Sequence, residues 1–541
     1  MPPARKQWRD QSIITVNDQR ALATPAASFL IPPGVRKAQL NRQFANKNDV
    51  LLAFIGLLLL LWAYSWEGYL TKTLDPVESS NFGAANLQSI LSMISRILQA
   101  ALFPLYSKLS DTIGRAETLI VSMVFYTVSF VAQATANSYG VFVAGSVVNT
   151  LGRADITLLL PLFVADMATV RQRGFYHGLF KLPTLINIFC TSFVANDLYY
   201  SGNWRWGYGR QPIIAIACVV LLLAGLCRPQ LRLCERFCIE IDTVGCLLLV
   251  GGLAMLLLPF VLVDTWGGWT PSKTLGTLIA GCISWIAFLI WELKFAKIPV
   301  FSPIHQRANR TAIYGILALS AAEFTTSTNW LYLSTYLQLA VGWLMMKTKT
   351  WRPYLWIGVA LMTLGVGLLI PAHLPTSSDG LIVISETVAG FGAGMIYVPL
   401  TVAIQSAVPH QDVSMMTCLY QVGSAVTDSI SDSIAGAIWN QMIPRELAHQ
   451  GFNATEIKHI IESITYAQNL PDNGTYQSVK YAYGETQKVL SIIGICTSLT
   501  PLLFTLGMKT FFLDDRDAEH QQQLFQEQQD LSPPSEAVVK A

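Results

Sequence analysis

A set of charged side chains lies inside stretches of sequence that are otherwise apolar. They are Glu67, Arg153, Asp155, Glu323, Glu386, Asp428 and Asp432. A charge inside a bilayer is costly unless it is paired or hydrated, so residues of this kind are functional candidates by default. A carboxylate in such a place can take up a proton in one conformation and release it in another. These residues are therefore candidates for a proton or substrate pathway.

Spacing along the chain divides these candidates. Asp428 and Asp432 are four residues apart and share one face of a helix. A hydrated cavity and a drifting, non-functional copy of the protein explain this pair equally well. Arg153 and Asp155 are two residues apart, so they point in different directions and each needs a partner elsewhere. A fixed ion pair, for instance between Arg153 and Glu67, is the alternative to a transport role.

A second group of charges lies in a short segment between two apolar runs. Residues 107–117 read SKLSDTIGRAE, in which Gly114 permits a tight turn. Asp111 and Arg115 can then join the cytoplasmic ends of the two flanking helices, and the charges of 166–173 can complete this contact. A contact that forms in only one conformation shifts the balance between the states of a carrier, although a solvated turn with chance charges is the alternative. The predicted cytoplasmic gate consists of Asp111, Gly114, Arg115, Asp166, Arg171 and Arg173.

The apolar runs that contain these charges are long enough to cross a bilayer. The chain is 52% hydrophobic and 13% charged, whereas soluble domains are about 25% charged. About thirteen long runs occur, and runs of this length without alternation form helices in lipid. The sequence thus predicts an all-α membrane protein. It contains no Ser/His/Asp set, metal quartet, phosphate loop or nucleic-acid-binding pattern, so an enzyme, a cofactor and a resident metal are not expected.

The distribution of basic residues creates a conflict in the second half of the chain. Lys and Arg mark every second connection, so the first eight spans alternate from a cytoplasmic N-terminus. The ninth run, Thr311–Ala340, should then end outside, yet the basic cluster Lys347–Arg352 follows at once. A hairpin within 311–346 is one explanation, but its first arm of about 14 residues is too short to cross. We therefore predict that one helix of the C-terminal half is missing.

The long connection 444–487 carries several candidate features. With fourteen spans it lies outside, where the sequons at Asn453 and Asn473 predict N-linked glycans. Asn453 followed by Glu456 fits a helix capping box equally well. The length of the connection makes it a candidate lid. Tyrosines that line a substrate entrance, or that anchor a helix at the membrane interface, are Tyr476, Tyr481 and Tyr483.

Several motifs resemble those of a known transporter family. Segment 107–117 resembles the signature loop of the major facilitator superfamily, with Ser107 at the position of its usual first glycine. The stretches NWRWGYG at 203–209 and IAGAIW at 434–439 resemble the fungal siderophore–iron transporter branch of that superfamily. So does AYSWEG at 63–68, where the branch more often has Asp in place of Glu67. The resemblance extends from about residue 49 to residue 515.

This resemblance implies two six-helix bundles joined by two additional helices, with the missing helix as the expected tenth. The implied segments are a cytoplasmic tail (1–48), the N-terminal bundle (49–228), the additional helices (229–310), the C-terminal bundle (311–510) and a second cytoplasmic tail (511–541). The resemblance also implies a monomer that imports ferric siderophores with protons across the plasma membrane or endosomal vesicles. Two alternatives stay open, namely a fourteen-helix drug or toxin:proton antiporter and a transport-defective copy.

Overall fold

Long apolar runs dominate the sequence, and within the described residues every regular element is a helix. The computed structural model describes residues 47–81, 88–201, 203–226, 272–295, 310–329, 334–373, 377–408, 412–462 and 475–515, with six positions between 248 and 259. Seven of these helical segments are long and apolar enough, by length and composition, to cross a membrane. The predicted all-α membrane fold is therefore confirmed. Most of both predicted tails and of the first additional helix lies outside the described residues.

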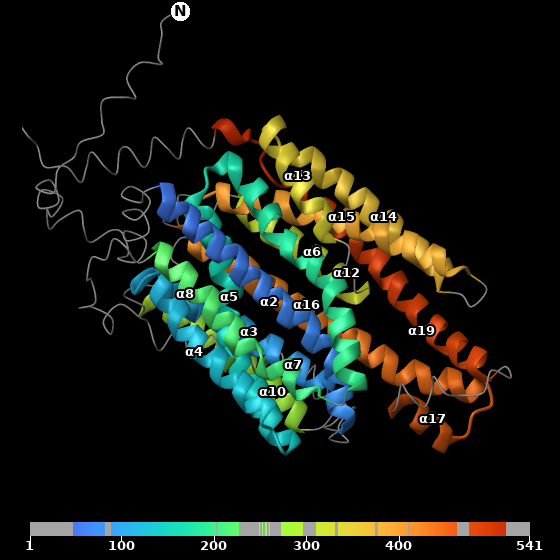
Figure 1. The fold of residues 1–541 in the computed structure, drawn as a ribbon. Helices are drawn as coiled ribbons and strands as arrows, with labels where there is room; N and C mark the ends of the chain where they lie inside the picture. Colours follow the sequence, from blue (N-terminus) through green and yellow to red (C-terminus); the bar gives the residue numbers. More distant parts are fainter. Residues whose placement is uncertain are drawn as a thin grey trace, which may run out of the picture.

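The first group of packed helices is called the N-terminal half (Figure 1). Its members are α2 (Lys47–Asn81), α3 (Gln88–Thr112), α4 (Arg115–Ala134), α5 (Tyr139–Met167), α6 (Val170–Tyr200), α7 (Arg205–Gly209) and α8 (Gln211–Leu226). α2 packs against α6 and α8, while α5 packs against α3 and α4. Gly114 joins α3 to α4 with a φ of 126°, a conformation that side chains with a Cβ rarely adopt. This glycine therefore permits the tight turn that the sequence predicts.

The second group is called the C-terminal half. Its members are α12 (Arg310–Asn329), α13 (Ser334–Thr348), α14 (Arg352–Ala372), α15 (Asp379–Ser406), α16 (Val413–His449), α17 (Ala454–Glu462), α19 (Thr475–Ser498) and α20 (Thr500–Leu506). α14 and α15 form a closely packed pair, and α12 contacts α15, α16 and α19. The small residue Gly365 makes the α14–α15 contact possible, because a Cβ there would lie 2.2 Å from the backbone nitrogen of Ala389.

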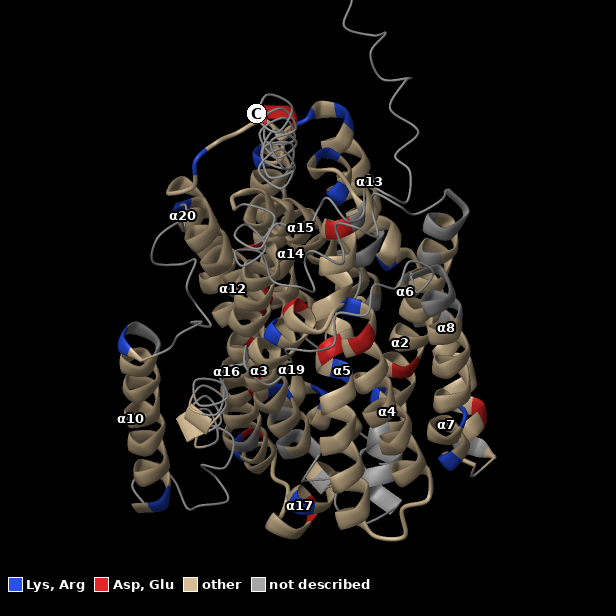
Figure 2. Cartoon of the chain, turned by 90° about the vertical axis from the view of Figure 1, so that its left-hand side faces the viewer, with Lys and Arg blue, Asp and Glu red and all other residues tan. Residues whose placement is uncertain are grey.

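One helix stands apart from both halves. α10 (Ser272–Lys294) packs Phe288 against Val422 and Val426 of α16 (Figure 2). Much of its remaining surface is apolar and exposed, including Ile279 and Ile283. Since isoleucine gains from leaving water, this surface is suited to face lipid. α10 lies within the segment 229–310, for which the resemblance implied two additional helices.

The prediction that a whole helix is missing from the C-terminal half is wrong. Residues 310–348 form two helices, α12 and α13. Near the start of α12, the Thr311 hydroxyl accepts a hydrogen bond from the backbone N–H of Lys509 at 3.1 Å. Just after α13, Lys349 pairs with Asp514 at 2.5 Å. The chain therefore leaves and returns to the same side of the molecule, which explains the basic residues at both positions.

The threonine-rich end of α12 explains the error. The hydroxyls of Thr325, Thr326 and Thr328 each donate to a backbone carbonyl four residues earlier. These bonds satisfy the hydroxyl groups within the helix, and α12 has 20 residues and not about 14. α13 has 15 residues, or about 22 Å, against a hydrocarbon core of about 30 Å. The tenth helix is thus short but present.

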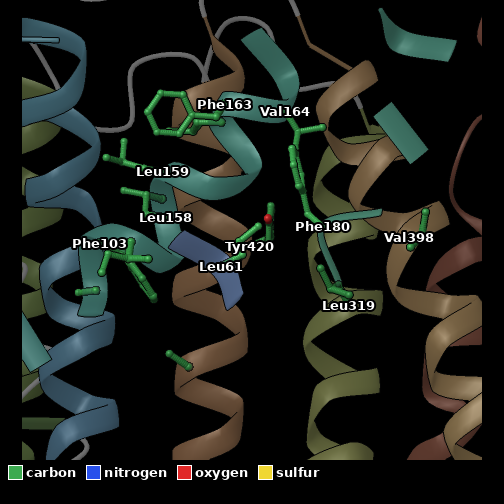
Figure 3. Packing of buried hydrophobic residues seen from close by; sticks show 14 of the residues in the cluster. Leu61, Phe103, Leu158, Leu159, Phe163, Val164, Phe180, Leu319, Val398 and Tyr420 are labelled. Carbon is green, nitrogen blue, oxygen red and sulfur yellow. The ribbon is translucent and has the colours of Figure 1, made fainter. Parts of the chain in front are cut away.

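The two halves meet closely along α6 and α13. A Cβ at Gly178 of α6 would lie 2.4 Å from the Cα of Leu339, and one at Gly342 of α13 would lie 2.1 Å from the carbonyl oxygen of Gly174. Only glycine fits such a backbone contact. One buried apolar cluster also continues from one half into the other (Figure 3). Its members include Leu61, Phe163, Phe180, Leu319, Val398 and Tyr420.

A small second core closes one end of the C-terminal half, where α17 lies beside α19 and the last turns of α16 (Figure 1). We call this region the outer cap, and its buried members are Ile443, Leu447, Ile460, Val479 and Ala482. α16 has 37 residues, or about 55 Å, and so extends well beyond a bilayer core. Two residues after its end lies Gly451, whose φ is 89°, and the N–H of Phe452 bonds the carbonyl of Leu447. This glycine-based end turns the chain back toward α17.

Candidate functional site: a charged cavity and a contact between the halves

Polar side chains of α2, α3, α4, α5 and α7 surround a cavity of about 320 Å³ inside the N-terminal half. Its described lining contains three cationic groups, Lys72, Arg96 and Arg153, and one carboxylate, Glu67. Hydroxyl and amide side chains complete this lining, among them Thr71, Ser95, Gln99, Gln133, Ser146 and Asn149. N–H and O–H donors therefore outnumber carboxylates. This composition suits an oxygen-rich ligand.

Glu67 and Arg153 form an ion pair within the N-terminal half. The Nη1 atom of Arg153 donates to both carboxylate oxygens of Glu67, at 2.6 and 2.7 Å. The guanidinium carbon also lies 4.9 Å from the ring centre of Tyr64. Glu67 is only 2% exposed, so each charge depends on the other for compensation. The ion pair named in the sequence analysis is therefore present in this conformation.

Asp428 and Asp432 bind the same arginine from the opposite half. Arg96 of α3 contacts Asp428 through Nη1 and Asp432 through Nε, both at 2.9 Å. The hydroxyl of Ser327 on α12 donates to the second oxygen of Asp428. The four-residue spacing thus places both carboxylates on one face, as expected. The resulting cluster joins α3 of one half to α12 and α16 of the other.

The other carboxylates in apolar runs have different surroundings. Asp155 is fully buried in the N-terminal half and accepts a hydrogen bond from Ser122 at 2.6 Å. Glu323 of α12 lies within electrostatic reach of Asp428 and therefore belongs to the neighbourhood of Arg96. Glu386 lies on α15, and no ion pair among the described residues joins it to either cluster. The structure therefore separates the pathway candidates into several places.

The predicted cytoplasmic gate contains an inner part that lies within one half. Arg115 bonds Asp111 at 2.6 Å and Ser110 at 2.6 Å, and contacts Asp166 at 3.4 Å. Arg115 is only 7% exposed, so these contacts are more buried than a solvated turn would allow. These charge-assisted hydrogen bonds connect α3, α4 and α5.

The other gate residues reach across to the C-terminal half. Arg171 donates to the backbone carbonyl of Met346 at 3.0 Å, and Arg173 donates to that of Gln405 at 3.5 Å. At the same end of the molecule, the hydroxyls of Ser107 and Ser414 lie 3.1 Å apart. The two halves are therefore in contact at the gate in this conformation.

The outer-cap candidates have mainly structural contacts. The ring of Tyr483 packs edge-on against Trp439 at 5.3 Å, while Tyr476 lies beneath the ammonium group of Lys480 at 5.2 Å. Tyr481 is exposed, with 40% of its surface accessible. Of the two sequons, Asn453 is exposed and its backbone N–H donates to Glu456 at 3.0 Å, as in a capping box. Asn473 lies outside the described residues.

The sequence interpretation missed two residues that contribute to these contacts. Arg96 interrupts the apolar run 90–106, and this interruption was the available signal. Gln405 is fully buried and contacts His177 at 3.4 Å and Thr417 at 3.3 Å, so it joins α15 to both halves. Within the described residues, no group of three or more His, Cys, Asp or Glu side chains is placed to hold a metal ion.

Curated relatives resemble the chain along most of its length. It is 23% identical to a siderochrome iron transporter C of Aspergillus fumigatus, over 90% of this chain and 88% of the relative. It is 24% identical to siderophore iron transporter 1 of Saccharomyces cerevisiae, over 91% and 87%. Among solved structures, the proton:xylose symporter XylE matches 87% of this chain and 98% of its own, at 15% identity and a TM-score of 0.50. At this identity the structural match shows the fold alone.

A match to a family model assigns the chain to a protein family, which the geometry of the site alone does not do. The model of the Major Facilitator Superfamily matches residues 50–431, which include the cavity, the gate and the Arg96 cluster up to Asp428. The sequence resemblance to the siderophore–iron branch is likewise confirmed by the fungal relatives. The chain belongs to the Major Facilitator Superfamily.

Proposed function

We propose that this protein is a secondary active transporter that imports ferric siderophores together with protons. The observation that carries the proposal is the similarity to fungal siderophore–iron transporters over about nine-tenths of the chain. The cavity supports it, because its hydroxyl, amide and cationic groups suit the oxygen-rich surface of a ferric chelate. The iron needs no protein ligand, since the chelator supplies them all.

The arrangement of charges supports coupling to protons. Carboxylates within the membrane-spanning helices lie at a contact between the halves, where a conformational change alters their surroundings. We further propose that the gate contacts of Arg171 and Arg173 form in the conformation that is closed to the cytoplasm. The protein would act as a monomer in the plasma membrane or in endosomal vesicles, with 49–228 and 311–510 as its two bundles.

The test is uptake of a radiolabelled ferric trihydroxamate by yeast cells that lack their own siderophore carriers. Cells that express the full chain should accumulate the label, and a protonophore should abolish this accumulation. Cells with an empty vector provide the background. Accelerated loss of label from preloaded cells would instead favour a proton-coupled exporter. Correctly localised protein with neither activity would favour a transport-defective copy.

A further inference from the structure

Arg96 belongs to two sites at once. It lines the cavity of the N-terminal half, and it also binds Asp428 and Asp432 of the C-terminal half at 2.9 Å each. Its side chain is 32% exposed, so it is not enclosed by the two aspartates. By contrast, Arg153 in the same cavity is occupied by both oxygens of Glu67. Arg96 is therefore the arginine whose partners change when the halves separate.

We propose that Arg96 exchanges between the Asp428–Asp432 pair and an anionic oxygen group of the substrate, and that the vacated aspartate pair binds one proton while Arg96 holds the substrate. This inference rests on the proposed function. It names the chemical class that the site prefers, a ferric chelate with a negatively charged oxygen group such as a pendant carboxylate. It also makes Arg96 the link between substrate binding and proton binding.

Charge balance supports the exchange of one proton. Charged groups on four other helices face the aspartate pair or its neighbours. They are Arg96 of α3, Lys72 of α2, Lys181 of α6 and Glu323 of α12. With Arg96 in place and all of these groups ionised, three carboxylates face three cationic groups. When Arg96 turns to the substrate, one negative charge is left in excess, and an uncompensated charge is costly in a low-dielectric interior. One proton from the solution, forming an O–H bond on one carboxylate, restores the balance.

The depth of the cluster gives the exchange a direction. Arg96 lies about 24 Å along α3 from its cytoplasmic end at Thr112, and Asp432 lies about 28 Å along α16 from Val413. The cluster therefore belongs to the outer part of the contact between the halves, whereas Ser107 and Ser414 meet at the cytoplasmic end. Opening the outer part frees Arg96 and exposes the aspartates together. Substrate and proton then load from the same side, as symport requires.

The first test measures specificity in full-length protein in lipid nanodiscs. The probes are two derivatives of ferric desferrioxamine B, one with its terminal amine acetylated (neutral) and one with it succinylated (anionic). Wild-type protein should bind the succinyl probe about tenfold more tightly. Arg96→Gln should abolish this preference, while Arg96→Lys, which keeps the charge, should retain part of it. An equal preference in wild type and Arg96→Gln would overturn the proposal.

The second test measures linkage to protons with the succinyl probe. Wild-type affinity should increase as the pH falls, by up to about tenfold per unit for one linked proton. Replacing both aspartates (Asp428→Asn with Asp432→Asn) should preserve binding and remove this pH dependence. Glu485→Gln is the matched control, because Glu485 pairs with Lys488 at 3.3 Å on α19, away from the cluster. An unchanged pH dependence in the double variant would overturn the proposal.

The third test needs no ligand, and so separates this proposal from the proposed function. Ser95 lines the cavity next to Arg96, and Ser95→Cys in a cysteine-free background reports access from outside through a membrane-impermeant maleimide. The double Asn variant should increase the labelling rate several-fold at constant pH, because the contact with Arg96 is weakened. A faster labelling rate in a protein that binds no ferric chelate would refute the proposed transport function and still support the proposed role of the contact between Arg96 and the aspartates. An unchanged rate would refute the contact.

Discussion

Two arginines bind carboxylates in different places of the molecule. Arg153 bonds Glu67 at 2.6 Å, and both residues belong to the N-terminal half. Arg96 bonds Asp428 at 2.9 Å, and these residues belong to opposite halves. Helices packed in one bundle move together when a carrier changes conformation, whereas contacts between bundles form and break. We therefore expect the Glu67–Arg153 pair to be structural and the contacts of Arg96 to change between conformations.

The largest effect is expected from breaking the structural pair. Glu67→Gln leaves the Arg153 charge without its partner, which should lower the free energy of unfolding by about 3–5 kcal/mol. Thermal unfolding of the purified protein should show this loss. Adding Arg153→Met to Glu67→Leu should restore most of the stability, since no buried charge is left unpaired. Normal stability with lost uptake would instead make Glu67 the proton carrier, and the comparison would fail.

The next effect concerns the contact of α6 with α13. Gly342→Ala places a Cβ 2.1 Å from the carbonyl oxygen of Gly174, so overpacking should cost about 1–3 kcal/mol. This cost applies only when the halves are together at the gate. Disulfide formation between Ser107→Cys and Ser414→Cys should therefore become slower. Gly140→Ala is the control, because a Cβ there meets nothing within 4 Å. An unchanged cross-linking rate in Gly342→Ala would show that the α6–α13 contact does not limit closure.

A smaller effect is expected at Gln405. Gln405→Leu removes the amide that contacts His177 and Thr417, and so weakens closure of the gate by about 1 kcal/mol. The same cross-linking assay should report a change of several-fold. Arg115→Gln is the informative contrast, since Asp111 and Asp166 both lie in the N-terminal half. Arg115→Gln should lower the thermal stability clearly and change the cross-linking rate little. A large change in the cross-linking rate with normal stability would contradict the distinction between contacts within one half and contacts between the halves.

The smallest effect is expected at the outer cap. If the exposed Asn453 carries a glycan, treatment with a glycosidase should increase the mobility of the protein on a gel. Asn453→Gln, studied in an Asn473→Gln background, should remove this shift. Stability should be unchanged, because the bond to Glu456 comes from the backbone N–H of residue 453. Reduced uptake in this variant would mean that the cap does more than position its own helices.

The helical fold and the shared helix face of Asp428 and Asp432 could both be predicted from the sequence. Their partner could not, because spacing defines a face of one helix and not the helix that it meets. Arg96 and Asp428 are separated by 332 positions in the chain, so only the packing of α3 on α16 brings them together. The same limit applies to Arg173, whose contact with Gln405 crosses the boundary between the halves.

The error over the missing helix has a local cause. Hydropathy treats Thr325 and Thr328 as interruptions, although their hydroxyls bond the preceding turn and leave the helix intact. Thr328 also lies 2.6 Å from the hydroxyl of Ser431, a contact that favours a polar side chain at this point of α12. The hydropathy pattern thus predicted that α12 exists and is helical, whereas tertiary contacts determine where it ends.

Because α16 is long, a small tilt of this helix would displace the outer cap over a large distance. The same helix contacts Ser107 near its start, carries both aspartates of the cluster in its middle and packs Ile443 and Leu447 into the cap. A tilt of about 10° would displace the far end of this 55 Å rod by about 10 Å, while a site near the pivot moves far less. Because α16, α17 and α19 share the core of the cap, we expect the cap to move together with the C-terminal half.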